Sequence, residues 1–252
     1  MKDFLLIYLS VLPIFLILLY VYNQDKDKEP IFLLLQLFGL GMISFFLVLG
    51  VSKGMEIIFP FMKLNGNSTF LDTLLFSFIG VALVEEGSKW TLLFTRGYFH
   101  KEFDEIYDII VYSVFVSLGF AFLENIVYIL SCRDLNVAIL RSISSVPGHA
   151  CNAIFMGYYL SLAKQFHYKN DLKRESRSIR LSLIIPTILH GIYDMCLLLN
   201  SSMFIYVFLF FISGLYIISI RKLKEVANHN KKMFEKEKES EYFTYNSIAK
   251  EE

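Results

Sequence analysis

Long apolar runs separated by short polar connections make up most of the chain. A helix of about 20 mostly apolar residues crosses about 30 Å of hydrocarbon. Seven stretches have that character, at about residues 4–22, 31–51, 70–94, 108–130, 137–163, 179–199 and 203–220. The pattern therefore predicts an all-α fold, a polytopic transmembrane helix bundle of about seven spans.

Two of these stretches need comment. The first has the short basic start of a signal peptide, but Pro13 interrupts its apolar run and no A-x-A site follows, so we expect a retained span. In the fifth, Arg141, a Ser-rich turn, Pro147 and His149 lower the hydropathy. Proline loosens a helix and frees backbone groups. A helix that lines a functional site explains this low hydropathy better than a loop does.

Composition supports a membrane protein. Hydrophobic residues make up 55% of the 252 residues, charged residues make up 19%, and the mean hydropathy is +0.51. These values are unusual for a soluble domain. Cys132, Cys151 and Cys196 form no C-x-x-C pair, so neither a disulfide framework nor a cysteine zinc site is expected. No nucleic-acid motif is visible, and DNA or RNA binding is not expected.

The basic residues predict an orientation. Segments 23–30, 95–107, 164–180 and 221–252 hold 18 of the 24 Lys and Arg, and the alternate connections hold 4. Cytoplasmic loops carry such an excess. We therefore expect the N-terminus outside, an integral membrane domain over residues 1–220, and a charged cytoplasmic tail over 221–252 that is either a solvated helix or disordered and has no catalytic role.

Two adjacent acidic residues, Glu85 and Glu86, interrupt the third span in FIGVALVEEGSKWTLLF. A carboxylate at bilayer depth costs roughly 2.5 to 3.5 kcal/mol on insertion scales, so such residues usually face a polar interior. Lys89 shares a helix face with Glu85, while Glu86 is rotated by about 100° toward another neighbour. One alternative is that Lys89 neutralises Glu85 merely to hold helices together, but that leaves Glu86 without a partner.

The fourth span carries Glu124 and Asn125 in GFAFLENIVY, with Phe120 on the face of Glu124. A lone buried Glu is also compatible with a packing anchor. A rise of about 1.5 Å per residue puts Glu85 about 22 Å and Glu124 about 9 Å from the outer ends of their spans. This estimate separates the two carboxylates. Helices tilt and span ends are uncertain, so we give more weight to the sequence motifs described below, which group the two residues in one site.

The fifth and sixth spans add histidines. Arg141, Ser145 and His149 recur at intervals of four, with Asn152 near the same face. In the sixth span His190 and Asp194 are also four apart, so the carboxylate is placed to accept the imidazole N–H and fix its tautomer. Spans three to six therefore form the expected catalytic or transport core.

Four motifs carry a family resemblance. VEEGSKW resembles the EExxK motif, GFAFLEN the FxxxEN motif, RSISSVPGHA the histidine-bearing third motif and LHGIYD the HxxxD motif of PrsW-type glutamic intramembrane proteases. These bacterial enzymes are relatives of the CAAX-processing endoproteases and bacteriocin self-immunity proteins. The resemblance covers about residues 69–199, with the motifs in order.

The resemblance implies a multi-pass endopeptidase of the bacterial cell membrane. Its expected partners are the lipid bilayer and a single-pass membrane protein substrate, an anti-sigma factor whose first (site-1) cleavage starts a stress-response cascade. No cofactor and no metal are expected. The expected catalytic residues are Glu85, Glu86, Glu124, His149 and His190, and the supporting residues are Lys89, Phe120, Asn125, Arg141 and Asp194.

The expected mechanism is peptide hydrolysis by glutamate-activated water. One member of the Glu85 and Glu86 pair acts as the general base, and the histidines stabilise the oxyanion or protonate the leaving amine.

Three alternatives remain open. Glu and His from several helices could form a zinc site, although no HExxH occurs; buried Glu and His also build proton-coupled transporters; and an immunity or scaffold protein would bind a peptide without cutting it.

Overall fold

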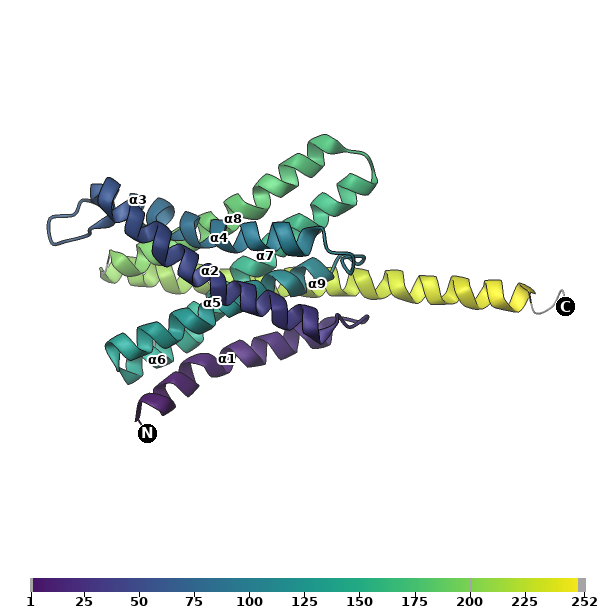
Figure 1. Ribbon diagram of the computed structural model, residues 1–252, viewed down its shortest axis with the longest axis horizontal. Helices are drawn as coiled ribbons and strands as arrows, with labels where there is room; N and C mark the ends of the chain where they lie inside the picture. Colours follow the sequence, from purple (N-terminus) through teal and green to yellow (C-terminus); the bar gives the residue numbers. More distant parts are fainter. Residues whose placement is uncertain (1, 200, 249–252) are drawn as a thin grey trace.

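The computed structural model describes residues 2–199 and 201–248, which are helical almost throughout (Figure 1). The elements are α1 (Lys2–Gln24), α2 (Ile31–Ile58), η1 (Pro60–Met62), α3 (Phe70–Leu75), η2 (Phe76–Leu83), α4 (Val84–Leu93), η3 (Phe94–Tyr98), α5 (Asp108–Cys132), α6 (Leu135–Leu140), η4 (Arg141–Ser145), α7 (Val146–Tyr168), α8 (Leu172–Leu198) and α9 (Ser202–Ile248). The described part of the chain contains no β-strand. The predicted all-α class is confirmed.

All seven predicted spans fall on helical segments, and five of these are long and apolar enough to cross a membrane. The five are α1, α2, α5, α8 and residues 202–230 of α9. The third and fifth predicted spans fall on residues 70–98 and 135–168, which are continuous but contain the π-helical segments η2, η3 and η4. Such segments are frequent at functional sites.

Helix α5 lies at the centre of the bundle. It packs against α1, α2 and α7, and consecutive helices run in alternating directions around it (Figure 1). Of its most apolar window, 78% is buried, against 22% to 39% for the other four spans. A helix that is apolar all round is expected at such a position.

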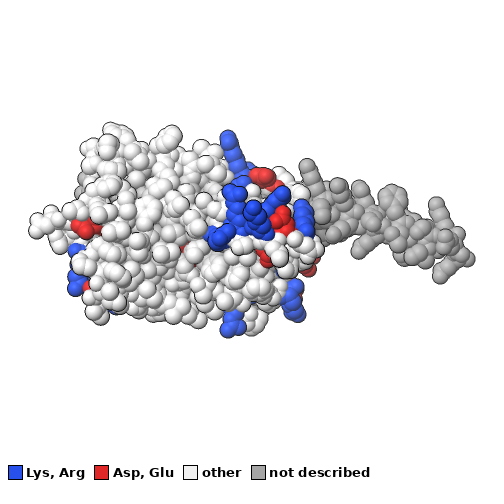
Figure 2. Space-filling model, turned by 90° about the horizontal axis from the view of Figure 1, so that it is seen from above, with Lys and Arg blue, Asp and Glu red and all other residues white. Residues whose placement is uncertain are grey.

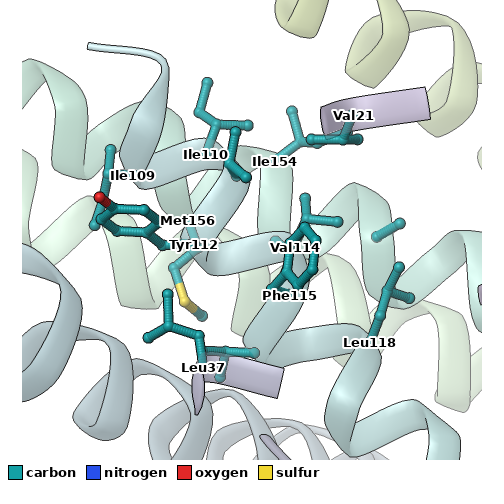
Figure 3. Close-up of a cluster of buried hydrophobic side chains, with 14 of the residues drawn as sticks. Val21, Leu37, Ile109, Ile110, Tyr112, Val114, Phe115, Leu118, Ile154 and Met156 are labelled. Atoms are coloured by element: carbon teal, nitrogen blue, oxygen red, sulfur yellow. The ribbon is translucent and has the colours of Figure 1, made fainter. Parts of the chain in front are cut away.

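The apolar core surrounds this central helix. Val114 and Leu118 of α5 meet Val21 of α1, Leu37 of α2 and Ile154 of α7 in one cluster (Figure 3). Large apolar side chains also cover the outer surface, including Phe4, Phe32 and Phe210. In a membrane protein such residues face lipid, where the helical backbone satisfies its own hydrogen bonds.

Two glycines set the distance between α2 and α5. A Cβ on Gly41 would lie 1.9 Å from the carbonyl oxygen of Val116, and a Cβ on Gly119 would lie 2.1 Å from that of Phe38. Small residues allow membrane helices to approach this closely. The contact fixes α5, and with it Phe120 and Glu124, against α2.

The charged tail continues the last span. Helix α9 extends without a break to Ile248, so no helix end occurs at residue 220. The expectation for residues 249–252 lies outside the described residues. On the visible face, Lys and Arg gather at the end of the bundle nearest the tail (Figure 2).

Candidate active site

Four helical segments bring ionisable side chains to one cavity of about 550 Å³. Helix α4 supplies Glu85 and α5 supplies Glu124. Segment η4 supplies Arg141, α7 supplies His149, and α8 supplies His190 and Asp194. The polar residues on its wall include Glu85, Glu124, Arg141, Ser144, Ser145, His149, Asn152, His190, Tyr193 and Asp194. Spans three to six therefore meet as the sequence predicted.

Helix α7 is fastened to α5 on the side of this cavity. The Ser117 hydroxyl donates to the backbone oxygen of His149 at 3.0 Å, and the Ser113 hydroxyl donates to that of Ala153 at 2.7 Å. Pro147 lies in the first turn of α7, directly after the π-helical segment η4. The backbone thus holds the histidine in place independently of its ring.

Glu86 is fully buried and contacts two basic side chains. Its Oε1 lies 2.8 Å from His190 Nδ1 and 2.9 Å from Lys89 Nζ. An ionised carboxylate only accepts hydrogen bonds, so His190 Nδ1–H donates to Glu86. The other ring nitrogen, Nε2, then lies 3.9 Å from Glu85 Oε2 and 3.4 Å from Asp194 Oδ2.

The predicted hydrogen bond from His190 to Asp194 is wrong. Asp194 Oδ2 is within ion-pair distance of His190 Nε2, but it accepts no hydrogen bond from the residues that the structure describes. Spacing along one helix placed the two side chains together, whereas the tautomer is fixed by Glu86 on another helix. Asp194 instead lies beside the ring, with its Oδ2 3.4 Å from Nε2.

His149 lies between Lys89 and Glu124. Its Nδ1 is 3.3 Å from Lys89 Nζ, and its Nε2 is 2.9 Å from Glu124 Oε2. An ammonium group only donates, so Nδ1 accepts and Nε2–H donates to the carboxylate. The two histidines face each other edge to face, with ring centroids 5.5 Å apart.

Glu124 also pairs with Arg141, whose Nη2 lies 2.8 Å from Glu124 Oε2. Arg141 Nε donates to Asn125 Oδ1 at 2.6 Å, and Asn125 Nδ2 donates to the backbone oxygen of Ser10 at 3.0 Å. Asn125 therefore positions the guanidinium and ties it to α1, outside the cavity wall. Glu124 lines the same cavity as Glu85 and contacts His149, so the two carboxylates lie together, as the motif grouping predicted. The estimate from helix rise, which assumed level span ends, therefore does not describe how the two spans are placed.

Lys89 joins the two halves of the site. Its ammonium lies 3.3 Å from Glu85, 2.9 Å from Glu86 and 4.1 Å from the centre of the Phe120 ring. The predicted Glu85–Lys89 pair is present, but the expectation that such a pair would leave Glu86 without a partner is wrong. One ammonium thus forms ion pairs with two adjacent carboxylates and a cation–π contact with the Phe120 ring.

Sequence reasoning gave no role to two further polar residues of the cavity. The Tyr193 hydroxyl lies 2.9 Å from Ser144 Oγ. Asn152 is 4% exposed, and its Oδ1 has no hydrogen-bond partner among the described residues. A tyrosine in an apolar span is usually core, so Tyr193 gave no separate signal. Asn152 was recognised only as a neighbour of the histidine face.

The centre of the site fits a metal ion. Glu85, Glu86, His149 and His190 each offer one donor atom, these atoms lie within 4.8 Å of one another, and all four residues are buried. Glu86 Oε2 is buried and has no hydrogen-bond partner among the described residues. Imidazole nitrogen and carboxylate oxygen are the ligands of catalytic zinc sites.

A family model described as "PrsW family intramembrane metalloprotease" matches residues 29–217. The chain is 35% identical over 222 residues to Protease PrsW of Oceanobacillus iheyensis, covering 88% of this chain and 95% of that protein. It is 35% identical over 228 residues to Protease PrsW of Bacillus subtilis (90% and 98%) and 32% identical over 230 residues to that of Clostridioides difficile (90% and 93%). No solved structure matches the chain.

Proposed function

The chain belongs to the PrsW family of membrane proteases, and from this premise we propose that it makes the first (site-1) cut in a single-pass, anti-sigma-factor-like membrane protein by means of glutamate-activated water. Peptidase activity in a membrane follows from the family. The identity of the substrate and the catalytic type are the proposed part. The observation that carries the mechanism is the different placement of Glu85 and Glu86.

Glu85 is the proposed general base. Its side chain lines the cavity, whereas Glu86 is 0% exposed and does not reach the cavity wall. A base must reach the proton that it removes directly or through one water. Glu86 instead accepts from His190 and Lys89, which suits a positioning role. This assigns different tasks to two adjacent carboxylates, where the sequence left open which one is the base.

The proposed reaction uses these groups in order. Glu85 removes a proton from water while the oxygen attacks the carbonyl carbon of the scissile peptide bond. The guanidinium of Arg141, which lines the cavity, stabilises the developing oxyanion, and His149 lines the same wall with its Nε2–H held by Glu124. The proton that Glu85 took from water passes to His190 Nε2, which lies 3.9 Å from Glu85 Oε2, and from there to the leaving nitrogen; the C–N bond breaks, and a carboxylic acid and an amine result.

The direct test is cleavage in a membrane. A candidate single-pass substrate with tags at both ends is co-expressed with the wild type or with the Glu85→Gln, Glu86→Gln double variant, and the new terminus is mapped. We expect a discrete fragment with the wild type only. An intact substrate that co-purifies with the wild type would indicate an immunity or scaffold protein, and an identical fragment from the double variant would overturn the proposed site.

A metal-dependent protease is the second candidate. It is favoured by the four converging donors, by Glu86 Oε2, which has no partner among the described residues, and by the description of the matching family as metalloproteases. Glu85, Glu86, His149 and His190 would hold the ion, which when bound acts as a Lewis acid that activates water. Lys89 contacts three of these residues and would then compete with the ion for their negative charge.

Chelation separates the two candidates. Purified protein is treated with 1,10-phenanthroline, and cleavage of the substrate is measured before and after addition of Zn²⁺. Glutamate-activated water predicts unchanged cleavage. Loss of cleavage that Zn²⁺ restores would establish the metal-dependent form in its place.

The proposed orientation follows from the basic residues. The connections rich in Lys and Arg, namely 23–30, 95–107 and 164–180, and the tail lie at the same end of the bundle (Figure 1). Cytoplasmic segments carry this excess. We therefore place the tail in the cytoplasm and the N-terminus outside. Cysteine labelling from the outside of intact cells at position 2 and at position 222, in a Cys132→Ser background because that cysteine is exposed, tests this placement, with labelling expected only at position 2.

A further inference from the structure

A second group of carboxylates lies outside the active-site cavity. Asp25 comes from the connection between α1 and α2, Glu105 from the connection before α5, and Asp108 from the first residue of α5. One oxygen of each lies within 4.8 Å of the others. None of the three lines the active-site cavity.

Asp25 is the unusual member of this group. It is 3% exposed, and neither of its carboxylate oxygens has a hydrogen-bond partner among the described residues. The nearby Lys28 ammonium donates instead to the backbone oxygens of Tyr22 and Asp25. A buried carboxylate without a partner is costly, so each such group needs an explanation.

The other two carboxylates are held in place by the protein. Asp108 Oδ2 accepts from the backbone N–H of Glu105 at 2.7 Å and from that of Asp104 at 3.2 Å. Glu105 Oε2 accepts from Asn230 Nδ2 of α9. Two ordered carboxylates thus face the unpartnered Asp25, and the arrangement joins three segments that are distant in sequence.

Negative charge accumulates at this place. Glu29 is also buried, and its Oε2 has no hydrogen-bond partner among the described residues. Burial first and the neighbouring Glu105 second raise the pKa of Asp25 to about 7, and burial raises the pKa of Glu29 to about 7. The connection therefore holds its carboxylates in surroundings that favour either a proton or a cation.

We propose that Asp25, Glu105 and Asp108 form a site for a hard divalent cation, Mg²⁺ or Ca²⁺. Both ions prefer carboxylate oxygen, and Mg²⁺ commonly keeps water for its remaining positions. The absence of imidazole and thiolate from this donor set disfavours zinc and copper. The cation fastens the α1–α2 connection to the start of α5, and through Glu105 and Asn230 to α9.

The test is cation-dependent thermal unfolding of the full-length protein. Protein purified in detergent is freed of metal with a chelator, and its Tm is followed while Mg²⁺ or Ca²⁺ is added. We expect a saturable rise on the order of 5 °C for the wild type at a cation concentration one hundred times Kd. Asp25→Asn and Glu105→Gln should abolish that rise.

Two controls locate the effect. Asp27→Asn changes an exposed carboxylate of the same connection and should keep the full rise. The Glu85→Gln, Glu86→Gln double variant removes two donors of the active site and should also keep it. Gel filtration and the Tm without cation establish that each variant folds, and either Asp25→Asn or Glu105→Gln alone suffices for the comparison.

Two results would overturn the proposal. An equal rise in the wild type, Asp25→Asn and Glu105→Gln would place the cation elsewhere. Absence of any rise in the wild type with both ions would mean that protons alone compensate these carboxylates.

Discussion

Glu124 Oε2 lies 2.9 Å from His149 Nε2, although the two residues belong to different helices. The same oxygen lies 2.8 Å from the Arg141 guanidinium. Glu124 therefore acts as the acceptor at the end of a chain that starts at Lys89 and passes through the imidazole of His149. It orients the ring and compensates the positive charge of Arg141.

Removing only one charge of the Arg141–Glu124 pair should lower the unfolding free energy more than removing both charges. Arg141 and Glu124 side chains are only 13% and 15% exposed, so Arg141→Gln leaves a poorly solvated carboxylate. We expect a loss of about 3 kcal/mol in unfolding free energy for the single variant and a smaller loss for Arg141→Gln with Glu124→Gln. Thermal unfolding in detergent measures both.

An exposed ion pair provides the control for that cycle. Lys53 and Glu56 also form a pair, but the Lys53 side chain is 76% exposed. Lys53→Gln should change stability by less than about 1 kcal/mol. Equal losses from Arg141→Gln and from the double variant would show that Glu124 and Arg141 are not coupled.

The two adjacent glutamates should differ in kinetics. Glu85→Gln removes the proposed base, so we expect the cleavage rate to fall by about 10²- to 10⁴-fold. Glu86→Gln keeps an oxygen that accepts from His190, and the expected loss is on the order of 10- to 100-fold, as for other groups that orient active-site ligands. Substrate cleavage is normalised to the amount of each variant in the membrane. A larger loss in Glu86→Gln than in Glu85→Gln would exchange the two roles.

The fold was largely predictable because burial in lipid imposes a simple length rule. Runs of about 20 apolar residues placed each of the seven predicted spans on a helical segment. Pro147 with its polar neighbours marked a stretch that the structure shows to contain a π-helical segment. The close approach of α2 and α5 at Gly41 and Gly119 was not predictable. At several other glycines of the spans, an added Cβ would have no atom within 4 Å. Only the three-dimensional arrangement distinguishes them.

The sequence predicted which side chains lie together around the cavity, but only part of their contacts. Intervals of four residues showed which side chains share a helix face, and the motifs grouped Glu85, Glu124, His149 and His190. Spacing along one helix cannot show which partner on another helix wins, so Asp194 was preferred over Glu86 for His190. The cluster of Asp25, Glu105 and Asp108 left no signal, because Asp25 lies about 80 residues before the other two in the sequence.

The α2–α5 contact should tolerate no added methyl group at Gly41. A Cβ there would lie 1.9 Å from the backbone oxygen of Val116, which cannot rotate away. We expect Gly41→Ala to lower the unfolding free energy by about 1 to 3 kcal/mol through overpacking. Gly39→Ala is the matched control, since no atom lies within 4 Å of its added Cβ, and it should be neutral or stabilising because Ala favours helix. Equal Tm values for the two variants would contradict the tight contact.

The carboxylates of the α1–α2 connection should make stability depend on pH when divalent cations are chelated. The pKa of Asp25 is raised from 3.8 to about 7, and that of Glu29 from 4.5 to about 7. Between these values the folded protein binds more protons than the unfolded chain, so their contribution to stability is complete below pH 4 and is lost as the pH rises to about 7. Tm measured from pH 5 to pH 8 in chelator should therefore fall, and Asp25→Asn with Glu29→Gln should flatten that fall. Because a bound cation replaces the protons, saturating Mg²⁺ or Ca²⁺ should reduce the slope in the wild type and leave the double variant unchanged; the same slope in both proteins would exclude Asp25 and Glu29 as its source.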